Sequence, residues 1–469
     1  MTKKFEYKTQ PFAHQREALR KGADSKSFAY FMEMGTGKTK VAIDNASYLH
    51  NLNLINTVLV IAPNSVYRNW IKEIQTHCSV NYNISAHKDD AKFDYRPDKL
   101  NFFLMNVEAL SHKSGVDVAN EIINPLNDKL MLIVDESTTI KNRSAKRTKN
   151  IIILGKKVKY KRILTGSPVT KSPLDLYSQC NFLDTKLLGF DSFYTFRARY
   201  AVMKQIEMAG RSVLLPQYYT NLDELEQKLK IFSYRVRKAD CLDLPEKVFQ
   251  RRTIQLYDQQ RQVYEALRKQ AYVVLSDTQV SFANKLTEIL RLHQVCNGFV
   301  GTDDGLINSF DKCNKLKELI NIIDEGEGKF IIWANYVYNI KTIINLLSKT
   351  YGKDSVVSIY GEITTKDREI AVKKFQEDST CRFFVGNPST GGYGLTLTAA
   401  SYVIYFSNSY NLEVRQQSED RAHRIGQKKN VVYIDIVAEK TIDDLIISAL
   451  KRKIKLSAET LGEEVVKWL

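Results

Sequence analysis

The stretch Phe28-Ala-Tyr-Phe-Met-Glu-Met-Gly-Thr-Gly-Lys-Thr39 is the strongest local signal in this chain of 469 residues. An apolar run enters a loop that contains Gly35 and Gly37, and a helical pattern follows from Lys38 to about Leu49. Glycines let backbone N–H groups approach a phosphate closely, and a helix N-terminus adds partial positive charge. This strand, loop and helix therefore predict a phosphate-binding site within an α/β fold.

Two side chains at the end of the loop suit the chemistry of a bound triphosphate. Lys38 would reach the β- and γ-phosphates, and the Thr39 hydroxyl would bind Mg²⁺. The full G-x-x-x-x-G-K-T pattern fails at its first position, where Met32 stands. An accidental glycine-rich turn before a helix is therefore the alternative interpretation.

Two carboxylates downstream favour the phosphate interpretation. The apolar run Leu130-Met-Leu-Ile-Val ends in Asp135 and Glu136. Asp135 suits coordination of Mg²⁺ through water, and Glu136 suits orienting and deprotonating the attacking water. Acidic pairs after a strand are common by chance, but one that follows a phosphate loop in the same sheet predicts a nucleoside triphosphate site.

Apolar runs alternate with amphipathic stretches towards both ends of the chain. Runs such as Thr57–Pro63 and Asn101–Met105, with a helical stretch at Tyr67–His77 between them, favour a parallel sheet covered on both faces. A second series begins near Lys329, whereas Leu174–Asn314 has a mainly helical pattern. The sequence predicts two α/β domains with a helical insertion between them. The expected limits are 1–185, 186–314 and 315–469.

The charge of the chain points to a polyanionic partner. Lys and Arg number 69 against 53 Asp and Glu, a net charge of +16, for which a solvated basic surface is the alternative. No apolar run approaches the roughly 20 residues of a membrane span, and the N-terminus has no apolar signal region. The six cysteines are scattered without a C-x-x-C pair. They favour a reducing, cytoplasmic compartment and disfavour a zinc site or a disulfide scaffold.

A series of motifs runs in order along nearly the whole chain. They are Pro11-Phe12 with His14-Gln15, Met32–Thr39, Ala62–Ser65 with Asn69-Trp70 and Glu73, Asp135–Asn142, Leu164–Pro168, Leu244–Lys247, Leu290–Asn297, Ser389–Ala400 and Gln417–Gln427. By these motifs the chain resembles the Swi/Snf-like branch of superfamily 2 helicases and DNA translocases. The most specific of them is Gln417-Ser-Glu-Asp-Arg-Ala-His-Arg-Ile-Gly-Gln427. With hardly any residues outside the motor, the chain is similar to a compact protein of a bacterial nucleoid or a phage-infected cell.

The resemblance implies two tandem RecA-like domains that bind ATP and Mg²⁺. Gln15 would recognise the adenine base, and Arg421 and Arg424 would act as arginine fingers. Three residues apart on a helix, both guanidinium groups would lie on one face, whereas ion pairs with Glu419 and Asp420 are the alternative. The predicted nucleotide ligands are Gln15, Gly35, Thr36, Gly37, Lys38, Thr39, Gly392 and Gly394. The predicted metal ligands are Thr39 and Asp135, and the predicted catalytic residues are Lys38, Glu136, Arg421 and Arg424.

The sequence departs from the family pattern at two places. Ser137-Thr138 replaces the Ala-His of the nucleotide box, which puts in doubt the coupling role of that histidine. Met32 stands where the family has Asp. The resemblance also gives Leu164–Pro168 a role in coupling the nucleotide and nucleic-acid sites, and it makes Lys451–Lys455 a brace against the core.

The residues that would contact nucleic acid are less sharply defined by the sequence than those of the nucleotide site. Lys141 to Arg162 contains ten basic residues and no acidic one, which suits sequence-independent phosphate contacts or, alternatively, a solvated face. Trp70 and Trp333 could stack on bases, but core packing is the favoured interpretation. The predicted nucleic-acid contacts are Asn64, Ser65, Lys141, Asn142, Arg143, Ser389 and Thr396.

These features predict a monomeric, ATP-dependent motor that moves along DNA, with duplex DNA favoured over branched or single-stranded DNA. A true strand-separating helicase is one alternative, and an ATP-gated DNA clamp with little hydrolysis is another. Asp435 with Glu439-Lys440 faintly resembles a metal-nuclease pattern, but a last strand and its exit turn is the favoured interpretation there.

Overall fold

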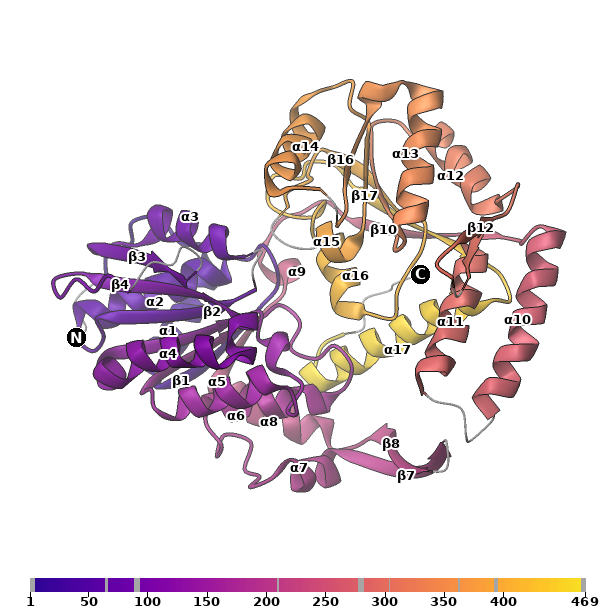
Figure 1. The fold of residues 1–469 in the computed structure, drawn as a ribbon. Coiled ribbons are helices and arrows are strands. Elements are labelled where there is room, and N and C mark those ends of the chain that lie inside the picture. The colour runs from indigo at the N-terminus through magenta and orange to yellow at the C-terminus, as the bar shows by residue number, and fades with distance from the viewer. Residues whose placement is uncertain are drawn as a thin grey trace. The chain divides into compact units, whose positions relative to one another are not determined.

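The computed structural model describes residues 5–63, 66–87, 93–208, 211–276, 282–302, 304–361, 363–391 and 395–464. Contacts within the chain group these residues into two compact units (Figure 1). The first unit runs up to Val202 and also includes Tyr219–Asp243 and Leu456–Glu464. The second unit includes Met203–Tyr218 and Leu244–Lys455. The domain limits expected near residues 185 and 314 stay a prediction.

The first unit contains a parallel sheet with the strand order β3-β4-β2-β5-β6-β1-β9. Its strands are β1 (Ser27–Met32), β2 (Thr57–Ala62), β3 (Tyr82–Ala86), β4 (Leu100–Asn106), β5 (Leu130–Asp135), β6 (Tyr160–Leu164) and β9 (Ser233–Val236). All residues of β2 and β5 are buried, because helices cover both faces of a parallel sheet. The continuous apolar runs of the sequence follow from this burial.

Two groups of helices cover the faces of the first sheet. One core contains Ala18, Val41 and Trp70 from the first three helices, and the other contains Ile122 and Ile151 from the next two. The helices of this unit are α1 (Ala13–Gly22), α2 (Lys38–Asn51), α3 (Tyr67–His77), α4 (Lys113–Leu126), α5 (Lys146–Lys156), α6 (Leu176–Leu183), α7 (Phe193–Tyr200), α8 (Leu222–Phe232) and α9 (Lys238–Cys241).

The second unit has its own parallel sheet, with the order β10-β17-β16-β13-β15-β14. Its strands are β10 (Lys247–Ile254), β13 (Lys329–Trp333), β14 (Val356–Ile359), β15 (Phe383–Gly386), β16 (Ala400–Tyr405) and β17 (Val431–Ala438). Its helices are α10 (Asp258–Ser276), α11 (Phe282–Cys296), α12 (Asn314–Glu325), α13 (Val337–Tyr351), α14 (Thr365–Glu377), α15 (Pro388–Gly391), α16 (Leu412–Glu419) and α17 (Ile442–Leu461), the last turns of which belong to the first unit. The expected pair of parallel-sheet α/β domains is confirmed.

The segment Leu174–Asn314, for which the sequence indicates a mainly helical structure, contains more strands than expected. Besides its helices it forms β7 (Ala201–Met208), β8 (Arg211–Tyr219), β9, β10, β11 (Phe299–Gly301) and β12 (Ile307–Ser309). β9 and β10 are edge strands of the first and second sheets. β10 carries the exposed side chains of Gln250 and Arg251, so it lacks the continuous apolar run of a central strand. None of the helices in the described part of the chain has the length and apolarity of a membrane span.

Candidate functional site

Three neighbouring strands of the first unit bring the predicted nucleotide motifs to one edge of the sheet. In the parallel register Asp135 of β5 lies opposite Leu164 of β6, and Leu164 lies opposite Tyr30 of β1. The carboxyl ends of these strands therefore lie at the same edge, where ligands of open α/β sheets bind. The loop after β1 carries the glycines that we predict to bind phosphate, and the loop after β6 carries the Leu164–Pro168 motif.

The phosphate loop has the backbone geometry that its glycines permit. Gly35 and Gly37 have φ values of 87° and 86°, in the left-handed region that favours glycine, and Gly37 is the N-cap of α2. At Gly166 a Cβ atom would lie 3.1 Å from the backbone nitrogen of Met34. The loop after β6 therefore packs directly on the phosphate loop, and a glycine at position 166 permits this close approach.

The predicted adenine-recognition residue also lies against the phosphate loop. The Nε2 group of Gln15 donates a hydrogen bond to the carbonyl of Thr36 at 3.0 Å, and the ring Nε2 of His14 lies 2.8 Å from the same oxygen. Gln15 is buried, whereas Phe12 as a residue is 52 % exposed, and its ring stacks on that of His14. α1 is thus connected to the loop at Thr36, and Phe12 offers an accessible aromatic face beside it.

The predicted catalytic pair of this unit is in direct contact. The Lys38 Nζ atom lies 2.9 Å from the Oε1 atom of Glu136, and both side chains are about nine-tenths buried. Glu136 has a φ of 47°, a left-handed conformation that is strained for a residue other than glycine. Strain of this kind persists at functional sites when the surrounding structure holds it in place. The structure therefore brings the phosphate loop and the acidic motif together, as the sequence predicts.

Trp70 holds the carboxylate that we expect to bind the metal. Its indole Nε1 donates to Oδ2 of Asp135 at 2.8 Å, while the Glu136 backbone N–H donates to Oδ1 at 2.8 Å. Trp70 is fully buried, so the core interpretation of this residue is confirmed, and so is that of Trp333. The sequence did not reveal the contact with Asp135, because α3 and β5 are far apart in the chain.

The residues expected to bind Mg²⁺ have suitable chemistry. The Thr39 hydroxyl lies in the first turn of α2, and Asp135 ends β5 at the same edge of the sheet. Each oxygen of Asp135 keeps acceptor capacity beyond its single hydrogen bond. Hydroxyl and carboxylate oxygens are ligands that Mg²⁺ prefers, so these residues fit the ion.

The two predicted arginine fingers lie in the second unit, after the end of α16. The expectation that one helix face carries both is wrong, because α16 ends at Glu419 and tight i to i−3 turns follow it. The two guanidinium groups nevertheless converge. Nη1 of Arg421 and Nη1 of Arg424 both donate to the carbonyl of Leu395, at 3.4 and 3.3 Å. Gln427 fixes the turn by donating to the carbonyls of Thr398, Ala400 and Ala422.

A buried ion-pair network that the sequence did not reveal holds α16 on its sheet. Arg415 pairs with Asp435 of β17 and with Glu419, and all three side chains are buried. Lys247 of β10 pairs with Glu419 and Asp420, which were the alternative partners of the arginines. Asp435 lies within β17, so its interpretation as part of the last strand is confirmed.

The predicted nucleic-acid contacts are described only in part. Asn64 and Ser65 lie outside the described residues, as do the nucleotide ligands Gly392 and Gly394. Lys141 is half-buried and donates to Oγ1 of Thr170 at 2.8 Å. Of the remaining predicted contacts, Asn142, Arg143 and Ser389 are exposed and Thr396 is half-buried.

Arg143 is held by aromatic side chains of α7. Its guanidinium carbon lies 4.4 Å from the ring centroid of Phe193, and its Nη2 group donates to the Tyr194 hydroxyl at 3.3 Å. Stacking leaves the exposed edge of a guanidinium group able to donate to a phosphate. This arrangement orders a cation at the surface of the first unit.

Arg162 does not belong to the basic track in which the sequence placed it. Its side chain is fully buried and donates to Asn45 Oδ1 at 2.8 Å and to the carbonyls of Gly22 and Lys26. Burial lowers the pKa of Arg162 and raises the pKa of the neighbouring Tyr30 to about 12. A charge run in the sequence does not distinguish a cation on a central strand, which is buried on both faces of the sheet, from a cation on an exposed helix.

We expect the substitution Arg162→Met to destabilise the protein by about 3 kcal/mol or more, because it removes several charge-assisted hydrogen bonds from the core. Lys149→Met, at an exposed position of α5, should leave the unfolding free energy within about 0.5 kcal/mol of the unsubstituted value. Urea unfolding followed by circular dichroism measures both effects. A stable Arg162→Met variant with weakened DNA binding would contradict the structural role.

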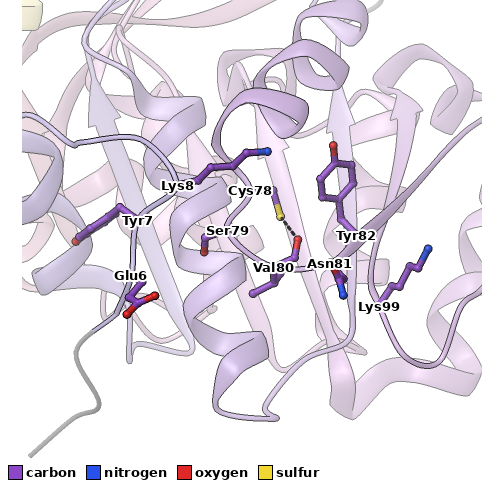
Figure 2. Close-up of a pocket in the computed structure, with 9 residues that line it drawn as sticks. All are labelled: Glu6, Tyr7, Lys8, Cys78, Ser79, Val80, Asn81, Tyr82 and Lys99. Carbon is purple, nitrogen blue, oxygen red and sulfur yellow. Dashed lines mark hydrogen bonds between the residues drawn. The ribbon is translucent and has the colours of Figure 1, made fainter.

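A cavity of about 620 Å³ lies away from this site (Figure 2). It is bordered by the segment before α1, by the segment between α3 and β3, and by Lys99 just before β4. These positions are at the amino ends of β3 and β4, whereas the phosphate loop follows the carboxyl end of β1. Within it, the Cys78 thiol donates to the Val80 carbonyl, and burial raises the thiol pKa. The cavity therefore contributes nothing to the nucleotide chemistry.

The sheet edge, the phosphate loop and the acidic motif define an α/β protein with a nucleotide site of the phosphate-loop type. Residues 26–299 match the SNF2-related domain, and residues 311–426 match the helicase conserved C-terminal domain. The chain belongs to the SNF2-related family.

Several known proteins are similar to this chain. A Caenorhabditis elegans homologue of the SWI/SNF-related regulator of chromatin subfamily A-like protein 1 is 29 % identical over 90 % of this chain and 57 % of its own length. The Bacillus subtilis putative ATP-dependent helicase/translocase YwqA is 27 % identical over 92 % of this chain and 46 % of its own length. The chain thus spans about half the length of these relatives. The Sulfolobus solfataricus SWI2/SNF2 ATPase core, solved in complex with double-stranded DNA, is 24 % identical to this chain. The structural match covers 99 % of this chain and 96 % of that chain, and its TM-score is 0.45.

Proposed function

We propose that this protein is an ATP-driven motor that moves along double-stranded DNA. The observation that carries the proposal is the contact of 2.9 Å between Lys38 and Glu136 at the carboxyl edge of the first sheet. It joins a phosphate-binding cation to a candidate general base. The membership of the family and the surface cations of α5 support DNA as the partner. A cytoplasmic location beside bacterial or phage DNA is part of the proposal.

The chemical step consists mainly of positioning and charge neutralisation. Lys38 and the backbone N–H groups of the phosphate loop bind the β- and γ-phosphates, and Gln15 and Phe12 receive the base. Glu136 orients the attacking water and accepts its proton. Thr39 and Asp135 would hold Mg²⁺, which would supply positive charge to the bound phosphates. Arg421 and Arg424 act as the proposed arginine fingers and supply further positive charge to the phosphates.

Nucleic-acid selectivity tests the proposed substrate. We expect the ATPase rate to rise most with double-stranded DNA, less with single-stranded DNA and least with RNA. The measurement is the steady-state rate at saturating ATP with each nucleic acid at equal nucleotide concentration, and Lys38→Ala serves as the inactive control. Stimulation of the ATPase by RNA alone would contradict the proposal. An ATPase rate that no nucleic acid changes would favour the alternative of an ATP-gated DNA clamp with little hydrolysis.

Two displacement assays separate translocation from strand separation. A translocase on duplex DNA displaces the third strand of a triplex and leaves the duplex intact, whereas a helicase releases one strand of a forked duplex. We expect ATP-dependent triplex displacement without release of the forked strand. Strand release at a comparable rate would instead favour the true helicase.

A further inference from the structure

A buried glutamine connects two motifs of the first unit. Gln179 lies in α6 and is fully buried. Its Oε1 atom accepts from the Ser137 hydroxyl at 2.7 Å, and its Nε2 group donates to the Pro168 carbonyl at 2.9 Å. Ser137 follows the candidate base Glu136, and Pro168 lies in the loop after β6 that packs on the phosphate loop. One amide therefore joins the acidic motif to the loop after β6.

The chemistry of the contact is specific to a side-chain amide. An amide accepts through its oxygen and donates through its nitrogen, whereas a carboxylate only accepts and an aliphatic side chain does neither. Both partners are buried, so water does not readily replace the missing group. Ser137 is one of the two positions where this chain departs from the Ala-His of the family motif. Its hydroxyl thus supplies a contact that an alanine at the same position could not make.

A second branch leads from Gln179 towards the predicted DNA contacts. Its Nε2 group also donates to the backbone carbonyl of Asp175 at 2.9 Å. The Asp175 carboxylate accepts from the backbone N–H and the hydroxyl of Thr170, both at 3.1 Å, and from the backbone N–H of Lys171 at 2.8 Å. The Thr170 hydroxyl in turn accepts from Lys141 Nζ at 2.8 Å. These contacts form a continuous path from a candidate DNA-binding lysine to the neighbour of Glu136.

We propose that Gln179 is a positioning residue that couples nucleic-acid binding at Lys141 to the orientation of Glu136. A phosphate that draws Lys141 away from Thr170 changes the hydrogen bonding of Asp175 and of the loop after β6, which contains Pro168 and Thr170. Gln179 transmits this change to Ser137, and the backbone of Glu136 moves with it. The inference rests on the proposed function, because it requires an ATPase that DNA stimulates.

The test measures two quantities for each variant. The first is the maximal stimulation of the ATPase rate by DNA, and the second is the DNA concentration that gives half of this stimulation. We expect Gln179→Leu and Ser137→Ala each to lower the maximal DNA-stimulated kcat, relative to the rate without DNA, by about 3- to 30-fold. The half-saturating DNA concentration should stay within twofold, because neither residue is among the predicted phosphate contacts. Lys141→Ala should raise that concentration instead. The double variant Gln179→Leu, Ser137→Ala should lose no more stimulation than the stronger single variant.

Gln260→Leu provides a matched control. Gln260 is also a fully buried glutamine that donates to a backbone carbonyl, but it lies in α10 of the second unit. Its substitution should lower the melting temperature without changing the stimulation ratio. Should Gln179→Leu fail to fold, the milder Ser137→Ala decides the question. Unaltered stimulation of the ATPase by DNA in a folded variant would overturn only the coupling role of Gln179. If DNA did not stimulate the ATPase of the unsubstituted protein, both the proposed function and the coupling role would be overturned.

Discussion

Replacing Glu136 with glutamine should lower the kcat of ATP hydrolysis by about 10²- to 10⁴-fold, the usual contribution of a general base. Glutamine has nearly the same shape as glutamate but cannot accept the proton of the attacking water. Steady-state hydrolysis at saturating ATP and DNA measures the loss of kcat. ATP binding, followed with a fluorescent analogue, should persist, because Lys38 and the phosphate loop remain.

The exposed Glu121 in α4 offers a control of the same chemistry. Glu121→Gln removes one negative charge from the same unit and should leave the rate within twofold. If Glu136→Gln hydrolysed ATP at the normal rate, the assignment of the base would be wrong. Another group would then have to activate the water.

Arg421→Ala and Arg424→Ala should each lower the DNA-stimulated kcat by about 10³-fold or more, in the range found for arginine fingers. The expected loss is large because a guanidinium group neutralises charge that develops in the transition state. Lysine should not restore the rate, since its single ammonium group lacks the planar fork of arginine. Rapid-quench kinetics with each variant measure this step separately from binding.

Arg452 is a suitable control for the two arginines, because it is an exposed arginine of α17 in the same unit. Arg452→Ala should leave kcat within twofold. A change confined to the KM for ATP in the Arg421 and Arg424 variants would show that these residues serve binding rather than the chemical step. Loss of stability without loss of kcat in the folded fraction would support a purely structural role.

The parts of the fold that could be predicted are those whose signal is local. The apolar runs of β2 and β5 are continuous because helices bury both faces of the sheet. The phosphate loop is recognisable because Gly35 and Gly37 adopt φ values that other residues avoid. Edge strands such as β10 were missed, since one side of an edge is exposed and its sequence is correspondingly polar.

The features that could not be predicted depend on contacts between distant segments. The bond from Trp70 to Asp135 and the bond from Gln179 to Ser137 join residues that are far apart in the chain. Arg162 belongs to a basic run by sequence, but its position on β6 turns it into the core. Residue type alone does not reveal these roles, because each role depends on which helix or strand packs against the residue in the folded protein.

The Lys38–Glu136 ion pair has a consequence for the choice between ATP and ADP. A phosphate that binds to Lys38 must compete with a carboxylate that is already within 2.9 Å. A triphosphate brings more negative charge to this lysine than a diphosphate does, so it competes better. We infer that Glu136, the proposed base, also competes with the product for Lys38. We expect this side chain to hasten the departure of ADP and so to reset the loop for the next turnover.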